Sequence, residues 1–449
     1  MGIALIVLAA GQGSRMLSDR PKVLHQIGGA PLLAHALVAG ETLDPDRRIV
    51  VIGHGGTEVA GVVTALDPEI TIAEQSEQLG TAHAVSMAAP ALKGHSGDAL
   101  VLYGDTPLIS SQTLDRMRAA RAAGADLVVL GFTATDPGRY GRLITEGDTL
   151  TRIVEWKDAT DEERKITLCN SGVIMAPSGR LMDWIGKVGN DNASGEYYLT
   201  DIVAIARAEG ASAIAVTCDE AETQGVNTRA ELARAEAAFQ ARARTAALED
   251  GVTLVAPETV FFGLDTHLGR DAVIEPHVVF GPGVTVETGA TIRAFSHLEG
   301  CHVARGAIVG PYARLRPGAE LAEDVRVGNF VEIKNAEIAA GAKVNHLSYI
   351  GDAEIGPGTN VGAGTITCNY DGVMKHRTTI GAGAFIGSNT MLVAPVTVGN
   401  EAMTGSGSVI TTSVPDGALA LGRARQVTKP GMARRLMEVL RALKAGKGA

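Results

Sequence analysis

The hydrophobic and polar positions follow two different rhythms along the chain. Up to residue 228, short apolar runs alternate with Ala-rich stretches, which predicts an α/β domain with a mostly parallel sheet. The predicted strands are Ile3–Ala9, Ile49–Ile52, Ala99–Leu102, Leu127–Gly131, Val173–Met175 and Ile214–Val216. Predicted helices between them include Leu32–Gly40 and Thr113–Ala123.

A single long helix is predicted between residues 229 and 250. This segment contains nine Ala and neither Gly nor Pro, a composition typical of an uninterrupted helix. Because the rhythm changes on its far side, we interpret it as a linker between two domains, 1–228 and 251–449.

After Gly251 the apolar positions recur every six residues, with occasional steps of five. This period is typical of hexapeptide repeats, in which each unit forms one face of a triangular β-helix. Its narrow interior favours Ile, Val and Leu, and its tight corners favour Gly. The predicted inward positions are Leu268, Ile274, Phe280, Val286, Ile292, Leu298, Val303, Val309, Leu315, Leu321, Val327, Ile333, Ile338, Val344, Ile350, Ile355, Val361, Ile380, Ile386, Leu392, Val398, Thr404 and Ile410.

One gap interrupts the repeats. Val361 and Ile380 are 19 residues apart, 13 more than one repeat, and the excess holds Thr367–Thr378. A long loop ejected from a regular solenoid is usually functional, and the alternative is a neutral surface insertion.

Composition narrows the class of protein. The 449 residues carry a net charge of −10, which argues against a general nucleic-acid binder. No apolar run approaches the length of a membrane span, and the apolar start lacks the features of a signal peptide. Four scattered cysteines predict reduced thiols and a cytoplasmic protein.

The C-terminal tail departs from this average. From about Arg423 it carries eight Lys or Arg residues and one acidic residue, a local charge of +7. Met432–Leu443 has helical spacing. The tail is either a solvated cap on the solenoid or a segment that meets an anionic ligand.

A glycine-rich turn follows the first predicted strand. The run Leu8–Met16 reads LAAGQGSRM, and Pro21–Leu24 reads PKVL. Backbone N–H groups in such a turn can approach a phosphate chain, and Arg15 and Lys22 could converge on its oxygens. Gly-x-Gly alone is weak evidence for a phosphate site, because it completes neither a dinucleotide-binding fingerprint nor a P-loop. The alternative is that both cations are plain surface charges.

These motifs resemble the sugar-1-phosphate nucleotidyltransferases. With the repeats behind them, the chain up to about Arg423 resembles the bacterial bifunctional N-acetylglucosamine-1-phosphate uridyltransferases and glucosamine-1-phosphate N-acetyltransferases. The resemblance implies a Rossmann-like nucleotidyltransferase domain, then a left-handed parallel β-helix. It also implies acetyl transfer from acetyl-CoA to glucosamine 1-phosphate, followed by uridylyl transfer from UTP to N-acetylglucosamine 1-phosphate.

The resemblance extends to further segments of the first domain, which match the uracil, metal and sugar motifs of that family. It implies that Arg15 and Lys22 act on the UTP phosphates, and that Asp105 and Asn227 hold Mg²⁺. The residues implied for UTP and the UDP-sugar are Leu8, Ala9, Ala10, Gly11, Lys22, Gln75, Gly80, Thr81, Tyr103, Gly104, Asp105, Gly141, Glu155, Asn170 and Asn227.

Polar residues also gather within the repeats. Arg316, Lys334 and Asp352 are each 18 residues apart, so at about 18 residues per coil we expect them to stack on one face. His346 and Tyr349 fall within one turn of that column. A neutral imidazole is suited to take up a proton at neutral pH.

The resemblance implies that this cluster is the acetyltransferase site, with His346 as the general base. It assigns Arg316 and Lys334 to the sugar phosphate, and Tyr349 and Asn360 to the sugar. Glu332 is a further candidate partner of the amine or of His346. The residues implied for acetyl-CoA are Ala363, Asn369, Tyr370, Ser388, Ser406 and Arg423.

Rival interpretations remain at this stage. A β-helix can carry a zinc site, but His297, His302, His346 and His376 lack the paired spacing that zinc chemistry needs. The chain could be a nucleotidyltransferase with a regulatory β-helix, or a scaffold without activity. The resemblance implies a homotrimer with sites at subunit junctions; the expected partners are small-molecule substrates, with no nucleic acid and no membrane.

Overall fold

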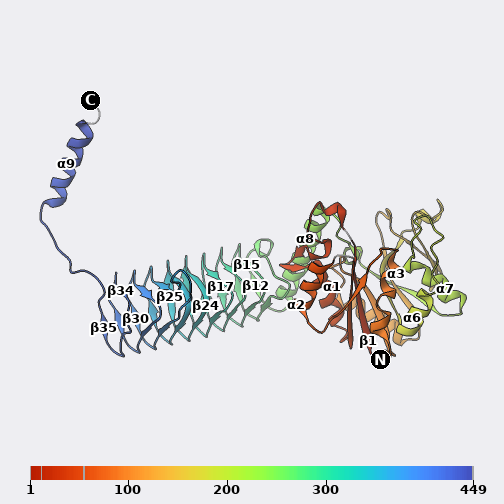
Figure 1. Cartoon of the computed structure of the whole chain (residues 1–449), viewed down its shortest axis with the longest axis horizontal. Coiled ribbons are helices and arrows are strands. Elements are labelled where there is room, and N and C mark those ends of the chain that lie inside the picture. The colour runs from red at the N-terminus through yellow and green to blue at the C-terminus, as the bar shows by residue number, and fades with distance from the viewer. Residues whose placement is uncertain (1, 12, 54–55, 447–449) are drawn as a thin grey trace. The chain divides into compact units, whose positions relative to one another are not determined.

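The computed structural model describes residues 2–11, 13–53 and 56–446. The chain divides into two compact units, Met1–His267 with Val279–Val284, and Leu268–Val278 with Thr285–Ala449. Figure 1 shows an α/β arrangement in the first unit and stacked coils in the second.

A twisted sheet forms the centre of the first unit. Its strand order is β11-β7-β10-β6-β1-β4-β5, and all neighbours are parallel except β10, which runs antiparallel to β6 and β7. The mostly parallel sheet predicted from the sequence is therefore confirmed. Its strands are β1 (Ile3–Ala9), β4 (Arg47–Gly53), β5 (Thr71–Gln75), β6 (Asp98–Tyr103), β7 (Leu127–Thr133), β10 (Leu168–Pro177) and β11 (Ala213–Cys218).

Two hairpins accompany the sheet. The pair β8 (Arg142–Glu146) and β9 (Thr149–Val154) joins the sheet through β10, and the pair β2 (Gln26–Ile27) and β3 (Ala30–Pro31) stands apart. The sequence pattern missed β5 and both hairpins, because these strands are short or half-exposed and lack a continuous apolar run.

Helices cover both faces of the sheet, and an apolar core lies under each layer. Strand β1 is buried along its whole length, as expected for a central strand covered on both faces. The helices of this unit are α1 (Leu32–Glu41), α2 (Thr57–Leu66), α3 (Thr81–Ser86), α4 (Ala89–Leu92), α5 (Ser111–Ala122), α6 (Ser178–Ile185), α7 (Ile202–Ala208) and α8 (Arg229–Glu249).

The long helix α8 lies within the first unit. The Thr228 side chain caps its N-terminus by accepting from the backbone N–H of Glu231 at 3.2 Å. Further along the helix, the Glu236 carboxylate accepts from the backbone N–H of Gly28 at 2.8 Å. The helix is therefore packed against the α/β unit rather than being a free connection.

The second unit is a parallel β-helix with three faces, which confirms the predicted fold. Every predicted inward position from Ile274 to Ile410 is buried. Two strands, β24 (Glu332–Ile338) and β26 (Tyr349–Ile355), turn a corner and contribute to two faces.

Face 1 contains β19 (Cys301–Val303), β22 (Ala319–Leu321), the ends of β24 and β26, β29 (Thr378–Ile380) and β32 (Val396–Val398). Face 2 contains β14 (Val273–Ile274), β17 (Thr291–Ile292), β20 (Ile308–Val309), β23 (Arg326–Asn329), β25 (Lys343–His346), β27 (Asn360–Val361), β30 (Phe385–Ile386), β33 (Met403–Thr404) and β35 (Leu419–Ala420). Face 3 contains β18 (His297–Leu298), β21 (Arg314–Leu315), the starts of β24 and β26, β28 (Ile366–Cys368), β31 (Met391–Val393) and β34 (Val409–Ile410).

Four further short strands are β12 (Thr253–Leu254), β13 (His267–Leu268), β15 (Val279–Phe280) and β16 (Val284–Val286).

The long interruption of the repeats is shorter than the sequence predicted. Thr367 lies in β28, is 1% exposed, and pairs with Leu392 of the next coil. It therefore occupies an inward position inside the predicted loop. A threonine fits there because its hydroxyl accepts from the buried backbone N–H of Gly351 at 2.8 Å. The inserted segment lies between Cys368 and Thr378.

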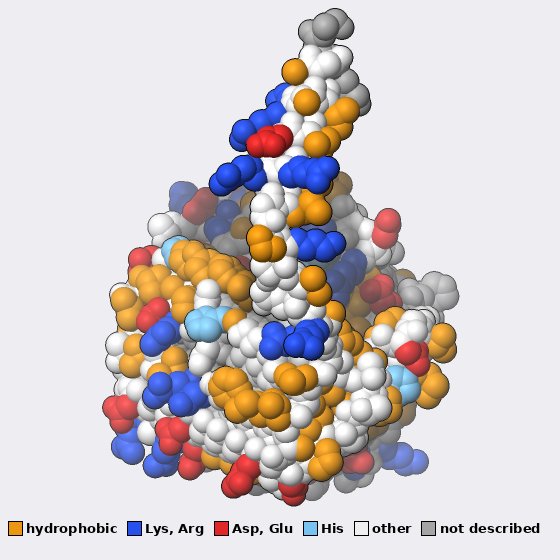
Figure 2. Space-filling view, turned by 90° about the vertical axis from the view of Figure 1, so that its left-hand side faces the viewer, with side chains coloured by type: hydrophobic (Ala, Val, Ile, Leu, Met, Phe, Trp, Pro, Cys, Tyr) orange, Lys and Arg blue, Asp and Glu red, His pale blue; other side chains and the backbone are white. Residues whose placement is uncertain are grey.

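The basic tail forms the helix α9 (Met432–Gly446), none of whose residues is buried. Figure 2 shows Lys and Arg side chains along the tail and hydrophobic side chains on another side of the helix. In the described chain, no helix is long and apolar enough to cross a membrane.

Candidate active sites

A pocket of about 330 Å³ opens at the carboxyl ends of β1, β5 and β6, where α/β sheets bind their ligands. Nine of the residues that the sequence predicted for UTP line it: Leu8, Ala10, Gly11, Lys22, Gln75, Gly80, Thr81, Tyr103 and Asp105. The sequence did not predict Val23, Gln78, Ala84 and Glu196, which also line it. Gln78 lies between the predicted residues Gln75 and Gly80, whereas Glu196 carries no local signal.

A cation lies at the polar end of this pocket. The buried Lys22 ammonium forms an ion pair with Asp105 and donates to Asn227 Oδ1 at 3.0 Å. Asn227 is held by its own backbone N–H, which donates to Glu231 at 2.8 Å. The carboxylate and amide oxygens predicted to hold Mg²⁺ thus converge on one positive charge, so the donor set suits a cation.

The glycine-rich turn is held tightly against this cation. Gly13 has a φ of 64°, and a Cβ on it would overlap the Lys22 side chain. Gln12, in the same turn, lies outside the described residues. Arg15, in the short helix Ser14–Met16, is exposed and does not line the pocket. The structure therefore brings Lys22, but not Arg15, to Asp105.

The predicted sugar-binding residues lie together. The Asn170 backbone N–H donates to the Gly141 carbonyl at 2.9 Å, and a Cβ on Gly141 would contact the Glu155 carboxylate at 3.4 Å. Asn170 stands where the pairing of β10 with β7 shifts register, so a bulge directs this segment. Thr200 donates to Glu155 at 3.1 Å, and burial raises the pKa of Glu155.

Tyr103 connects the sugar residues to the nucleotide pocket. Its ring packs on Gly172, and its hydroxyl is hydrogen-bonded to Thr81. Burial, with the nearby Asp105 and Glu155 charges, raises the pKa of Tyr103 well above its usual value. The phenol therefore stays neutral. Ala9 and Gly104 form the strand ends behind the pocket and do not line it.

In the β-helix, one corner aligns four of the predicted acetyltransferase residues. Asn329 pairs with His346, and the registers of the following coils place Ala363, Ser388 and Ser406 at the same position. We call these five residues the edge column: Asn329, His346, Ala363, Ser388 and Ser406. His346 is exposed, and its Nδ1 lies 2.9 Å from Asn329 Oδ1. Asn360 lies on face 2, one coil beyond Lys343.

Arg316 and Lys334 lie in register on face 3, but the predicted column does not continue to Asp352. Lys334 pairs with Gly351, because the coil between Ile333 and Ile350 has 17 residues rather than 18. Asp352 aligns with Asn335 instead, whose side chain donates to it at 2.5 Å. The expectation of an 18-residue column was therefore wrong at its third member.

Three cations converge on face 3. The Lys375 ammonium, from the inserted segment, lies beside Lys334 and lowers the pKa of Lys334, with Arg316 adding to the effect. Glu332 pairs with Arg316 at 2.8 Å and does not contact His346. The hydroxyl of Tyr349 lies over Gly351, on the same face. Like charges held this close provide a site for an anion.

The inserted segment is anchored on the far side of face 3. Buried Asn369 donates to Asp352, and Tyr370 donates to the Gly372 carbonyl at 2.6 Å. Although burial opposes it, hydrogen bonds from Asn335 and Asn369 lower the pKa of Asp352. Asn369 and Tyr370 are therefore not in the edge column, and Arg423 lies exposed beyond the last strand.

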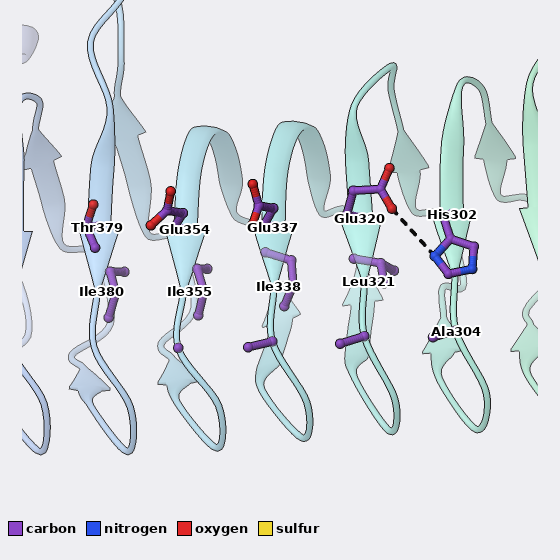
Figure 3. Close-up of a pocket in the computed structure, with 13 residues that line it drawn as sticks. His302, Ala304, Glu320, Leu321, Glu337, Ile338, Glu354, Ile355, Thr379 and Ile380 are labelled. Carbon is purple, nitrogen blue, oxygen red and sulfur yellow. Dashed lines mark ion pairs between the residues drawn. The ribbon is translucent and has the colours of Figure 1, made fainter.

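A second hollow, of about 520 Å³, runs along face 1 (Figure 3). Glu320, Glu337 and Glu354 stand in a row there, and the Glu320 carboxylate lies 3.5 Å from His302. None of the predicted site residues lines this groove. Among the described residues, no cluster of His, Cys, Asp and Glu is placed to hold a metal ion.

Comparisons with known proteins identify the family of the chain. Residues 5–167 match the family MobA-like NTP transferase domain, and residues 377–412 match Bacterial transferase hexapeptide (six repeats). Proteins named Bifunctional protein GlmU from Cereibacter sphaeroides, Dinoroseobacter shibae and Jannaschia sp. are 70%, 68% and 64% identical to this chain. These matches cover 99%, 100% and 99% of this chain and 98%, 100% and 98% of those proteins.

The chain belongs to the GlmU family. The resemblance seen in the sequence motifs is thereby confirmed, and the protein is a bifunctional uridyltransferase and acetyltransferase.

Among solved structures, a UDP-glucose pyrophosphorylase complexed with UDP-glucose shares 16% identity with this GlmU-family chain. The match has a TM-score of 0.43 and covers 54% of this chain and 100% of the pyrophosphorylase chain.

Within this GlmU-family chain, sequence reasoning missed two residues at the second site, Asn329 and Lys375. Asn329 precedes His346 by 17 residues, so counting the five-residue step would have aligned the two. Lys375 has no such signal, because it lies in a segment that follows no repeat.

Proposed function

We propose that the pocket at Lys22 and Asp105 carries out uridylyl transfer and that the corner at His346 carries out acetyl transfer. The two activities would then reside in the segments 1–228 and 251–449, with 229–250 between them. The observation that carries the second assignment is the edge column, which aligns a base with three residues implied for acetyl-CoA.

The first reaction needs charge neutralisation and alignment rather than a base. The phosphate of N-acetylglucosamine 1-phosphate is already an anion at neutral pH. Its oxygen attacks the α-phosphorus of UTP, the new P–O bond forms, and pyrophosphate leaves. Lys22 neutralises charge on the UTP phosphates, and Arg15 supplies a second cation from the adjoining turn.

Asp105 and Asn227 would hold Mg²⁺, because their oxygens already converge on the Lys22 ammonium. When bound, Mg²⁺ neutralises the charge that develops on the phosphate oxygens. The backbone of Ala9 to Gly11 approaches the phosphates. Gln75, Gly80 and Thr81 bind the uracil.

The sugar occupies the space beside Gly141, Glu155 and Asn170. Carboxylate and amide oxygens there can accept hydrogen bonds from sugar hydroxyls. Tyr103 lines the nucleotide pocket, and its ring packs on Gly172.

In the second reaction, His346 removes a proton from the amine of glucosamine 1-phosphate. The amine nitrogen attacks the thioester carbonyl of acetyl-CoA, the N–C bond forms, and the C–S bond breaks. The thiolate leaves with the proton that His346 releases. Arg316, Lys334 and Tyr349 bind the sugar phosphate, and Asn360 contacts the sugar.

The acetyltransferase site is incomplete in one chain. Leu347 and Asp352 both have positive φ and mark the two corners of face 3, with His346 at one corner and Asn369 at the other. Five residues of extended chain separate the corners by roughly 15 Å. We therefore propose a homotrimer in which Asn369 and Tyr370 of one copy complete the edge column of the next.

An exposed apolar row supports this assembly. Next to the edge column, the rings of His277, Phe295, Tyr312 and Phe330 stack at centroid distances of 4.8, 4.9 and 5.3 Å. Large apolar side chains exposed in a continuous row are typical of an interface between subunits.

Two full-length variants test the assignment of activities. We expect Asp105→Ala to abolish Mg²⁺-dependent pyrophosphate release and spare thiol release from acetyl-CoA, and His346→Ala to do the reverse. Loss of both activities in either variant, or of neither, contradicts the proposal.

Mixing inactive chains tests the trimer. Refolded mixtures of His346→Ala and Asn369→Ala chains should regain acetyl transfer, because some junctions then combine two intact edges. Each variant alone stays inactive. No recovery in mixtures that form heterotrimers would place the whole site within one chain.

The four cysteines of the chain are all free in the structure, as reduced thiols in a cytoplasmic protein are. A cytoplasmic location, which we propose, is also where UTP and acetyl-CoA would be available. Fractionation of cells is the direct measurement.

A further inference from the structure

We propose that Asn329 is a positioning residue that fixes the tautomer of His346, so that Nε2 is the nitrogen that takes the proton. This rests on the proposed function of His346 as the acetyltransferase base. Nothing in the sequence motifs assigns a role to Asn329.

The chemistry of the contact decides the tautomer. The Asn329 Oδ1 atom faces His346 Nδ1 at 2.9 Å. A carbonyl oxygen of an amide can only accept, so Nδ1 must carry the hydrogen. A neutral imidazole has one N–H, and its other nitrogen, Nε2, is then left with a lone pair. Within the described chain, Nε2 has no hydrogen-bond partner.

The backbone holds both residues of this pair in place. Asn329 and His346 are paired on adjacent coils, and the Leu347 N–H donates to the Asn329 carbonyl at 3.1 Å. The His346 carbonyl accepts from Ser348 Oγ at 2.9 Å and from the Gly364 N–H at 3.1 Å. The two side chains therefore meet because their coils are in register.

The alternative orienting group is a carboxylate, and the candidate that the sequence offered, Glu332, is engaged by other partners. Glu332 is engaged by Arg316 at 2.8 Å and by Arg314 at 3.8 Å. An amide has a distinct consequence: it fixes which nitrogen is the base without adding a negative charge that would favour the imidazolium. His346 can thus return its proton to the departing thiolate.

Three full-length variants test the proposal. Asn329→Leu keeps the size of the side chain and removes the acceptor. Asn329→Asp keeps the acceptor. Asn345→Leu is the matched control. It replaces an Asn by Leu next to His346 but removes no hydrogen bond to the imidazole. Circular dichroism and urea unfolding of the same chains report whether the β-helix of each variant is folded.

We expect Asn329→Leu to lower kcat for acetyl transfer about 10- to 100-fold, with KM values changing less than about threefold. Asn329→Asp should recover most of the lost rate, and Asn345→Leu should stay within about twofold of the wild type. Solid-state NMR of ¹⁵N-histidine-labelled protein, assigned by difference from His346→Ala, should show a protonated Nδ1 in the wild type. In Asn329→Leu the Nε2–H form should appear.

The outcomes separate this inference from the function on which it rests. If His346→Ala retains acetyl transfer, His346 is not the base and the assignment of the site fails. If His346→Ala is inactive but Asn329→Leu keeps the wild-type rate and tautomer, only the role of Asn329 is wrong. A protonated Nε2 in the wild type also overturns it.

Discussion

Lys22 donates from its ammonium to the carboxylate of Asp105, which lies 83 residues further along the chain. The same ammonium donates to Asn227, so the oxygens proposed for Mg²⁺ are neutralised by a side chain that also faces the nucleotide pocket. This arrangement makes Lys22 a competitor for the metal as well as a partner for UTP.

Replacing Lys22 by Met should separate these two effects. Without the ammonium, Asp105 and Asn227 are open to a divalent cation, so we expect Mn²⁺ to bind the nucleotide-free chain about fivefold to tenfold more tightly. The KM for UTP should rise at least about tenfold, because a phosphate contact is lost. Calorimetry measures the affinity for Mn²⁺, and pyrophosphate release measures the KM for UTP.

Lys93→Met is the matched control, because Lys93 is an exposed lysine of the same unit that does not line the pocket. Weaker Mn²⁺ binding by the Lys22 variant would contradict competition between the ammonium and the metal.

Glu155→Gln should stabilise the first unit at neutral pH while lowering its activity. Burial raises the pKa of Glu155 above its usual value of 4.5, so the folded state binds more protons than the unfolded state just above pH 4.5. The stability of the wild type therefore falls as pH rises through that window. The stability of the variant does not fall in this way. Each 1 kcal/mol of unfolding free energy that it gains over the wild type raises Tm by about 2–4 °C.

Tryptophan fluorescence can follow this unit alone, because both Trp residues of the chain, Trp156 and Trp184, lie in it. The difference in Tm should be near zero at pH 4 and grow towards pH 7. Glu146→Gln, at an exposed position of β8, should show no such growth. A difference in Tm between Glu155→Gln and the wild type that shrinks as pH rises would contradict the raised pKa of Glu155.

Lys375→Met should weaken binding of glucosamine 1-phosphate. Lys375 lies beside Lys334 and Arg316, so its removal takes one charge from the anion site, and we expect KM for the sugar phosphate to rise about tenfold. The pKa of Lys334 should return towards its usual value of 10.5. Thiol release from acetyl-CoA measures KM, and an unchanged urea unfolding curve shows that the β-helix is intact.

An unchanged KM for glucosamine 1-phosphate in that variant would mean that Lys375 faces away from the bound phosphate. The test discriminates because the proposed acetyl-CoA site follows the edge column, at the other corner of face 3.

Thr367→Val should destabilise the β-helix. The Thr367 hydroxyl accepts from the Gly351 N–H at 2.8 Å and donates to the Gly351 carbonyl at 3.0 Å. Valine has the same shape but leaves both buried groups unpaired, which costs about 1–3 kcal/mol of unfolding free energy. Urea unfolding followed by circular dichroism measures it.

The matched control is Thr379→Val, at an outward position of β29. It should change the unfolding free energy by less than about 0.5 kcal/mol. Equal effects at the two positions would show that Thr367 is not an inward residue.

Much of the fold and of the first site could be predicted from local pattern. The inward positions of the β-helix follow from a six-residue period, and Leu8, Gln75 and Asp105 each stand where a predicted or short strand ends. Since the carboxyl ends of parallel strands meet at one edge, separate motifs reach a common pocket. No such pattern marked the hairpin β8–β9 or Glu196.

The errors arose where small local irregularities accumulate. One five-residue step shortens a coil to 17 residues, which moves Asp352 from Lys334 to Asn335 and aligns Asn329 with His346. The sequence pattern places Thr367 in the loop, because a threonine rather than Ile, Val or Leu stands at that step of the repeat, yet its side chain is buried.

By itself, the sequence determined the two architectures, the family and the segments that carry chemistry, because periodicity and motif spacing are set by neighbouring residues. Only the tertiary structure decided that Lys22 lies between Asp105 and Asn227, that Lys375 approaches Lys334, and that Asn329 faces His346. Those pairs join residues far apart in the chain, and their contacts depend on coil register and on which strand ends the sheet brings together.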